Sequence, residues 1–293
     1  MQNSTATALT LDPMSGFLHN LSIEITARQI DKLPLLRDRL PAGTRVFIAL
    51  IDPADVAGQL HAAKELKQAG FTAIPHIPAR FVRDLEDLKS RIGALAQDAG
   101  VREMLVLGGG APTPIGQYDA AIQILETGVF EANGVTRIGI AGHPEGNADI
   151  SKQHGEAMLL TALRQKQSWL KAAGIEGFIA TQFLFEADPV ARWAKDLRGQ
   201  GIGLPIHVGV PGPATITTLV KYAAMCGVGN SARFIRKQAM NITRLLTVNT
   251  PDEFVSGLAE LHFNRPDLGI AGPHFYPFGG FDKLFDWLGP KLA

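Results

Sequence analysis

The sequence predicts an α/β protein folded as a (β/α)8 TIM barrel, with extra helices between the seventh and eighth strands. Short apolar runs alternate with amphipathic stretches about eight times between Leu21 and the C-terminus. Such alternation is typical of parallel strands joined by right-handed helical crossovers. No long linker interrupts the 293 residues, and a closed barrel needs about 250. We expect one catalytic barrel domain over residues 21–293, after an N-terminal extension over residues 1–20.

The apolar runs are the expected strands. They are residues 21–26, 45–51, 71–77, 103–109, 137–143, 177–183, 204–210 and 269–275. In a barrel of this kind the catalytic groups lie at the carboxyl ends of the strands, where the βα loops begin. The residues near the end of each run are therefore the first candidates for a site.

The amphipathic stretches between these runs are the expected helices, and the first five all end in glycine, as helix C-termini commonly do. They are residues 55–70, 84–100, 119–128, 156–174 and 189–199, followed by 215–225, 231–246 and 251–264 before the last strand. The last three form an insertion whose position on the barrel the sequence leaves open.

Composition narrows the class of protein. The 28 basic and 28 acidic residues cancel, which disfavours nucleic acid or an anionic membrane as partner. The single cysteine, Cys226, excludes a disulfide framework and is best interpreted as a buried hydrophobe in a reducing cytoplasm. Neither a signal peptide nor a membrane span is recognisable. We expect a cytoplasmic homo-oligomer that acts on a small molecule.

Glu24 is the first candidate for chemistry. Period-two alternation in the first strand places Ser22, Glu24 and Thr26 on one face. The surrounding helices require the other, apolar face, so Glu24 points into the lumen. Burial there is expected to raise its pKa and suit it to proton donation. The alternative, a structural pair with an interior Arg or Lys, is about equally compatible with the spacing.

Gln182 and four histidines are further candidates. The alternation sets Gln182 beside Ala180 and away from Thr181 and Phe183, and its amide can pair with a heterocycle edge or be satisfied in the core. The histidines recur near strand ends and are His76, His143, His207 and His274. Because no familiar metal-ligand spacing accompanies them, we expect no metal. Contacts to a ring face or a phosphate suit them better.

Loops after the fourth and fifth strands carry weaker signals. Gly108, Gly109 and Gly110 follow Leu107 and allow close approach of a flat ligand or phosphate, although tight turns need glycine in any case. The run AGHPEGN from residue 141 supplies polar groups, and the next helix carries Lys166, for which a solvated helix face is the alternative. Residues 227–237 hold a possible anion site.

Taken in order, these motifs resemble the methylenetetrahydrofolate reductase family over nearly the whole chain. They are IEIT in the first strand, PH in AIPHIP, the glycine turn after LVL, GIAGHPEGN, ATQF, GVPGP and HFYPF. The resemblance implies a barrel enzyme with FAD as cofactor and NADH or NADPH as reductant. It also implies a folate substrate, with 5,10-methylenetetrahydrofolate reduced to 5-methyltetrahydrofolate in one-carbon metabolism and methionine biosynthesis.

The resemblance also implies roles for single residues. Glu24 matches the acid that assists opening of the substrate's five-membered ring, and Gln182 and Phe183 match positions near flavin and pterin. The expected cofactor contacts are His76, Leu107, Gly108, Gly109, Gly110, Tyr118, Ala141, His143, Glu145, Asn147, Lys166 and Gln182.

The chain departs from the family at several positions. The family commonly carries an aspartate at the end of the glycine turn, where this chain has Ala111 after Gly110. His143 and Asn147 stand where tyrosine and histidine are usual. No regulatory domain is expected, and hence no inhibition through one by S-adenosylmethionine.

Two alternative functions therefore stay open. One is a folate-dependent methyltransferase-type barrel without redox chemistry. The other is a flavin- or pterin-binding paralogue with weak or no turnover, which the missing aspartate motivates.

Overall fold

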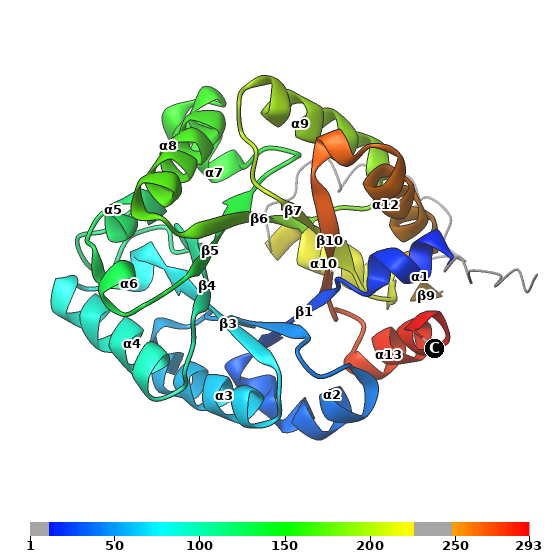
Figure 1. Ribbon diagram of the computed structural model, residues 1–293, viewed down its shortest axis with the longest axis horizontal. Helices are drawn as coiled ribbons and strands as arrows, with labels where there is room; N and C mark the ends of the chain where they lie inside the picture. Colours follow the sequence, from blue (N-terminus) through cyan, green and yellow to red (C-terminus); the bar gives the residue numbers. More distant parts are fainter. Residues whose placement is uncertain (1–11, 226–247, 293) are drawn as a thin grey trace, which may run out of the picture.

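The computed structural model describes residues 12–225 and 248–292. In this part of the chain, parallel strands close into a barrel in the order β1-β10-β7-β6-β5-β4-β3-β2 (Figure 1). The strands are β1 (Ser22–Thr26), β2 (Arg45–Ala49), β3 (Thr72–Pro78), β4 (Glu103–Leu107), β5 (Arg137–Gly142), β6 (Glu176–Phe183), β7 (Ile206–Pro211) and β10 (Ile270–Tyr276). Each overlaps one expected run, so the predicted fold class is confirmed.

Helices surround the barrel, and most of those expected are present. The described helices are α1 (Pro13–Leu18), α2 (Leu33–Arg39), α3 (Val56–Gln68), α4 (Leu85–Gln97), α5 (Ala121–Leu125), α6 (Val129–Ala132), α7 (Ala148–His154), α8 (Ala157–Ala173), α9 (Ala187–Gly199), α10 (Ile216–Met225), α12 (Asp252–Asn264) and α13 (Phe281–Leu292). The stretch 119–128 contains only the short helix α5, and α1, α2, α6, α7 and α13 were not expected. The predicted helix at 231–246 lies outside the described residues.

Glycine ends several helices as expected. Gly70, Gly100 and Gly174 follow α3, α4 and α8 with φ of 85°, 63° and 66°, the left-handed conformation that side chains disfavour. Gly199 behaves differently, because it is the last residue of α9 and Gly201 takes the positive φ of 76°. The turn is therefore two residues later than the pattern indicated.

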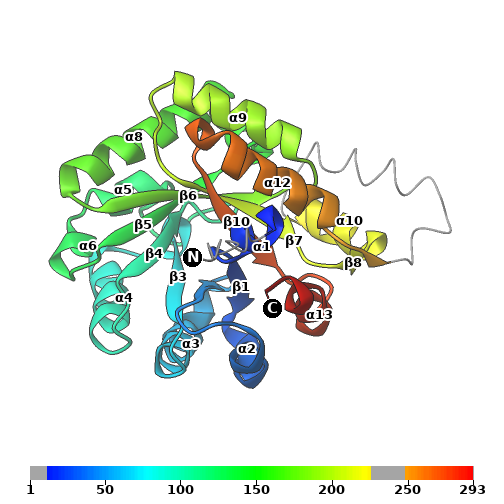
Figure 2. The same cartoon turned by 45° about the vertical axis from the view of Figure 1, so that its right-hand side comes forward.

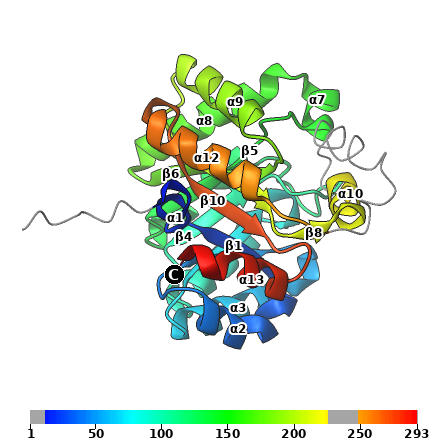
Figure 3. The same cartoon turned by 90° about the vertical axis from the view of Figure 1, so that its right-hand side faces the viewer.

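The insertion after β7 lies at the carboxyl end of the barrel. It includes α10 and an antiparallel pair formed by β8 (Ala214–Thr215) and β9 (Val248–Asn249). In the side view, α10 and β8 share one end of the molecule with α7, which follows β5 (Figure 3). The described part of the insertion thus borders the end where the strands finish.

Before β1, helix α1 packs against α12 and α13 (Figure 2). Phe17 and Leu18 of α1 are buried in the main hydrophobic core, so part of the expected extension contributes to the barrel's own packing. None of the described helices combines the length and apolar character that a membrane crossing would require.

Two phenylalanines divide the lumen of the barrel. Phe47 and Phe178 meet edge to face with ring centroids 6.1 Å apart, in a small interior cluster with Ile74, Leu105 and Ala180. Alternate residues of the same strands pack outward against the helices, as the pleat requires. Polar lumen residues are consequently sorted into one group on each side of these rings.

Candidate active site

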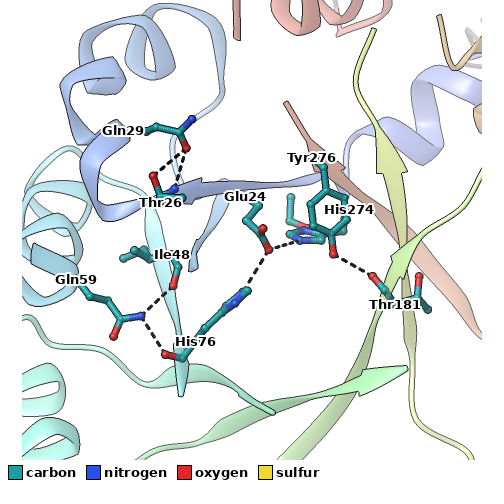
Figure 4. Close-up of polar contacts among 10 residues, drawn as sticks. Glu24, Thr26, Gln29, Ile48, Gln59, His76, Thr181, His274 and Tyr276 are labelled. Carbon is teal, nitrogen blue, oxygen red and sulfur yellow. Dashed lines mark hydrogen bonds and ion pairs between the residues drawn. The ribbon is translucent and has the colours of Figure 1, made fainter. Parts of the chain in front are cut away.

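Glu24 faces the lumen of the barrel, as predicted from the alternation in β1. Its Oε2 lies 3.4 Å from Nε2 of His76 on β3 and 3.5 Å from Nε2 of His274 on β10 (Figure 4). The Glu24 side chain is 20% exposed, whereas that of His274 is 1% exposed. The carboxylate is therefore enclosed by imidazoles but still reached by solvent.

Ser22 fixes the orientation of His274. The Ser22 hydroxyl lies 2.9 Å from Nδ1 of His274, and both residues are fully buried. The Phe47 ring packs against the imidazole with a centroid distance of 4.3 Å. With Nδ1 engaged, Nε2 is left to face Glu24. The period-two pattern of β1 places Ser22 on the same face as Glu24 and so in the lumen, but no role was predicted for it.

The pKa of Glu24 is lowered, which corrects the expectation of a raised value. Burial acts to raise the pKa, but hydrogen bonding with His274 and electrostatic attraction to His76 and His274 outweigh it. Burial also lowers the pKa of His76 to about 4. At neutral pH the cluster is therefore a carboxylate next to a neutral His76. The prediction of a raised pKa was wrong because it considered desolvation alone and not the histidines on β3 and β10.

The four histidines do not share one rim, which corrects their grouping at strand ends. His207 lies near the start of β7 on the far side of Phe178, with Nε2 3.5 Å from Nη1 of Arg45. Burial, Arg45 and Arg137 lower its pKa well below the ordinary value. Only His76 and His274 adjoin Glu24. Within the described ranges, no cluster of three or more His, Cys, Asp or Glu side chains is arranged to bind a metal ion.

A register shift in β6 changes the predicted surroundings of Gln182. The pairing with β7 is irregular between Ala180 and Phe183, and the backbone N–H of Gly209 donates to the Thr181 hydroxyl at 2.8 Å. Phe183 is fully buried in a cluster at the carboxyl end with Ile216 and Leu219, so it does not turn toward the outer helices. The partly buried Gln182 amide has no hydrogen-bond partner in residues 12–225 and 248–292.

Helix η3 (Ala79–Phe81) holds the glycine turn after β4. Gly109 has φ +94°, and a Cβ there would lie 2.9 Å from Cβ of Pro78, so only glycine fits without strain. Arg80 also holds the turn, because its backbone N–H donates to Gly108 O and its Nη1 to Ala111 O, both at 3.0 Å. Gly110 has no atom within 4 Å of a built Cβ, which leaves open space beside the turn.

Lys166, which is buried, and His143, which is partly buried, form a second polar group that has no acidic partner in the part of the chain that the structure describes. Lys166 on α8 is 8% exposed, and burial lowers its pKa to about 8. Burial, followed by the charge of Lys166, lowers the pKa of His143 to about 4. Nδ1 of His143 is buried without a hydrogen-bond partner in the described structure. The solvated-face interpretation of Lys166 was wrong, and a bound anion would stabilise the protonated form of Lys166.

The remaining predicted cofactor residues occupy varied environments. Leu107 packs against the interior cluster, and Ala141 pairs with Ala180 across the β5–β6 ladder. Tyr118 is 8% exposed and belongs to the outer core. The Asn147 side chain accepts from the N–H of Ile150 at 3.1 Å, so it begins α7. Glu145 is partly buried in the loop between β5 and α7.

Comparison with known families agrees with this geometry. The family model described as methylenetetrahydrofolate reductase matches residues 57–266, which is more than half of the chain. The chain belongs to the methylenetetrahydrofolate reductase family. The match begins in α3 and ends in η5 (Pro266–Leu268), so Glu24 and His274 lie outside it. Their place in a site rests on the barrel geometry, which brings both beside His76.

Proposed function

We propose that this protein is an FAD-dependent reductase that converts 5,10-methylenetetrahydrofolate to 5-methyltetrahydrofolate with NADH or NADPH. The observation that carries the proposal is Glu24, a carboxylate held inside the lumen by His76 and His274. Membership of the methylenetetrahydrofolate reductase family supports folate reduction. Bound FAD would supply hydride transfer, the step that protein side chains alone do not perform.

The residues present fit a flavin dinucleotide. The glycine turn after β4 admits a flat ring, because no side chain stands at Gly108, Gly109 or Gly110 and open space borders the last of them. Lys166 is a buried amine without a carboxylate partner among the described residues, and Nδ1 of His143 is buried without a hydrogen-bond partner there, which suits them to the pyrophosphate or ribityl oxygens. We assign Gln182 to the rings, since its amide can donate and accept at a heterocycle edge.

The role of Glu24 is to hold and deliver a proton through Oε2. Its pKa is low in the structure because His274 and His76 stabilise the carboxylate. Desolvation is the largest opposing effect, and a ligand that covers the remaining exposed part of the side chain strengthens it. A ligand bound at the mouth of the barrel therefore raises the pKa of Glu24 toward the range where it protonates the substrate ring nitrogen. Opening of that ring exposes the methylene carbon to hydride.

The substitution Glu24→Gln tests the proposal, because the amide keeps the size of the side chain and removes the acid. The variant should bind FAD and be reduced by NADH or NADPH as the wild type is, while folate-dependent reoxidation falls by about 100-fold or more, the lower range for loss of a general acid. Flavin reduction in the same sample is the matched control. Unchanged folate turnover would remove Glu24 from the mechanism.

Flavin binding, flavin reduction and methyl transfer, measured on the wild-type protein, separate the alternative functions. A protein that binds no flavin but transfers a methyl group from methyltetrahydrofolate would be a methyltransferase-type barrel. A protein that binds flavin without being reduced by either nicotinamide would be a paralogue with little turnover.

A further inference from the structure

A cavity lies outside the barrel, between α3 and α4. It has a volume of about 580 Å³, within the range of small-molecule sites. The two helices run side by side behind β3 (Figure 1). Its apolar wall includes Ala57 and Leu60 from α3, Ala94 and Leu95 from α4, and Ile115 from the loop after β4. Its inner wall includes Gln59 of α3 and His76, Ile77 and Pro78 of β3.

A buried arginine gives the cavity its chemical character. Arg91 lines it and its side chain is only 10% exposed. Asp87 takes one edge of the guanidinium, with Nε donating to Oδ1 at 3.1 Å and an Nη2 contact to Oδ2 of 2.7 Å. A guanidinium has five N–H donors, and Nη1 has no protein partner in the described part of the chain. The pair of N–H groups at the end of the guanidinium, one on Nη1 and one on Nη2, is therefore unoccupied, and we call it the free fork of Arg91.

The charges around the cavity favour an anion. The charged groups that line it are Arg83, Asp87 and Arg91, and Asp87 also accepts from the backbone N–H and a guanidinium N–H of Arg83. One carboxylate thus faces two guanidinium groups, which leaves one positive charge. Asp87 is a saturated acceptor, so the remaining N–H groups of the buried Arg91 are available to a ligand, beside the exposed Arg83 at the rim.

We propose that this cavity is a second ligand site, which binds a small organic anion with a flat apolar body. Such a ligand would place its carboxylate or phosphate on the free fork of Arg91, where charge-assisted pairing is bidentate. Its apolar body would lie between the alanine and leucine side chains of α3 and α4.

The site lies on the helix side of β3 and borders the lumen site at one residue, His76, whose Nε2 faces Glu24. Gln59 of α3 is buried, and its Nε2 donates to the carbonyls of Ile48 and His76 at 2.9 and 3.0 Å. These bonds tie α3 to β2 and β3, so the strands stand between the cavity and Glu24. The proposal goes beyond the proposed function, and binding at this site is measurable whether or not the protein reduces folate.

Calorimetric titration of the full-length protein with three probes tests the proposal. The probes are 2-naphthoate, 2-naphthyl phosphate and the neutral 2-naphthamide. We expect at least one anion to bind at a single site, with the amide about tenfold weaker or more, the factor for loss of a charge-assisted hydrogen bond. The tighter anion identifies the head group. Absence of saturable binding by both anions, or equal binding of the amide, would overturn the proposal.

Variants locate the binding. Ala57→Phe and Ala94→Phe fill the cavity from opposite walls and should each abolish the binding heat, and Arg91→Leu should weaken anion binding at least about tenfold. Lys89→Leu, which removes an exposed charge from α4 outside the cavity lining, is the matched control and should bind normally. The two Phe variants remain informative if Arg91→Leu fails to fold. Anion binding that persists in both would place the anion elsewhere and contradict the proposal.

Discussion

The Glu24 carboxylate owes its protonation behaviour to its neighbours more than to its burial. His274 and His76 hold its pKa below the ordinary value although the side chain is largely enclosed. Ser22 in turn engages Nδ1 of His274. The sequence alone predicted that Glu24 points inward, but the histidines that set its pKa come from strands roughly 50 and roughly 250 residues away, and no local pattern connects them.

Replacing Ser22 by alanine tests this chain of contacts. Loss of the hydroxyl leaves Nδ1 of His274 unpaired, a defect of about 1–3 kcal/mol, and frees the imidazole to turn from Glu24. We expect folate-dependent turnover to fall by about tenfold or more, with a displaced pH profile and unchanged flavin binding. Thr26→Ala, on the same face of β1 without a contact to histidine, is the control. An unaltered pH profile in Ser22→Ala would refute the role.

Lys166 gives a pH prediction for cofactor affinity. Its pKa of about 8 in the free protein means that it loses its proton as the pH rises through this value. If Lys166 pairs with FAD phosphates, the affinity for FAD is highest below this pH and declines above it. Fluorescence titration with FAD between about pH 7 and about pH 9.5, an interval that brackets the lowered pKa, should show the decline in wild type and a flat profile in Lys166→Met. Parallel profiles for both proteins would exclude the contact.

At the scale of elements, consecutive glycines in the loop after β4 have different structural roles. The sequence presents three equivalent glycines, but the structure distinguishes them by backbone conformation and space. Gly109 has φ +94° and meets Pro78, whereas nothing lies within 4 Å of a Cβ built on Gly110. Gly109 is required by the turn, whereas the space beside Gly110 is available to a ligand.

Alanine substitutions should therefore have opposite consequences. Gly109→Ala should lower the free energy of unfolding by about 1–3 kcal/mol, the usual cost of a strained conformation. Gly110→Ala should leave the stability unchanged and weaken FAD binding, because its methyl group occupies the open space. Denaturant unfolding of the flavin-free protein and FAD titration measure the two effects. The assignment fails if Gly110→Ala binds FAD normally or if Gly109→Ala is as stable as wild type.

Other elements show which features the sequence pattern could predict and which it could not. Strand positions followed from the apolar runs because each must bury a face against helices. The irregular β6–β7 register between Ala180 and Phe183 was invisible, since an alternation rule assumes an unbroken ladder. Helix α2 was missed because its seven residues, LPLLRDR, are too short for a periodic signal.

At the scale of the whole molecule, burial keeps several histidines of the closed barrel in the neutral form. Burial lowers the pKa of His76 and His143 to about 4, and that of His207 well below its ordinary value. The unfolded chain binds protons near pH 6.5, so it takes up more protons than the folded state between these values. Glu24, with a lowered pKa, acts in the same direction.

The free energy of unfolding should therefore fall as the pH decreases from about 6.5 to about 4, with about 1–3 kcal/mol for each fully buried histidine. Chemical denaturation at a series of pH values measures the slope. His207→Gln should reduce the slope, whereas substitution of the exposed His154 should not. A stability that is constant over this interval would contradict the assigned protonation states.

We propose that the mouth of this barrel holds a flavin that passes electrons from a nicotinamide to a folate. The most direct measurement is the anaerobic absorbance spectrum of the purified protein, supplemented with FAD, before and after NADH or NADPH and then after 5,10-methylenetetrahydrofolate. We expect a bound flavin spectrum that bleaches with the nicotinamide and returns with the folate. A protein that takes up no FAD, or whose flavin stays oxidised with both nicotinamides, would contradict it.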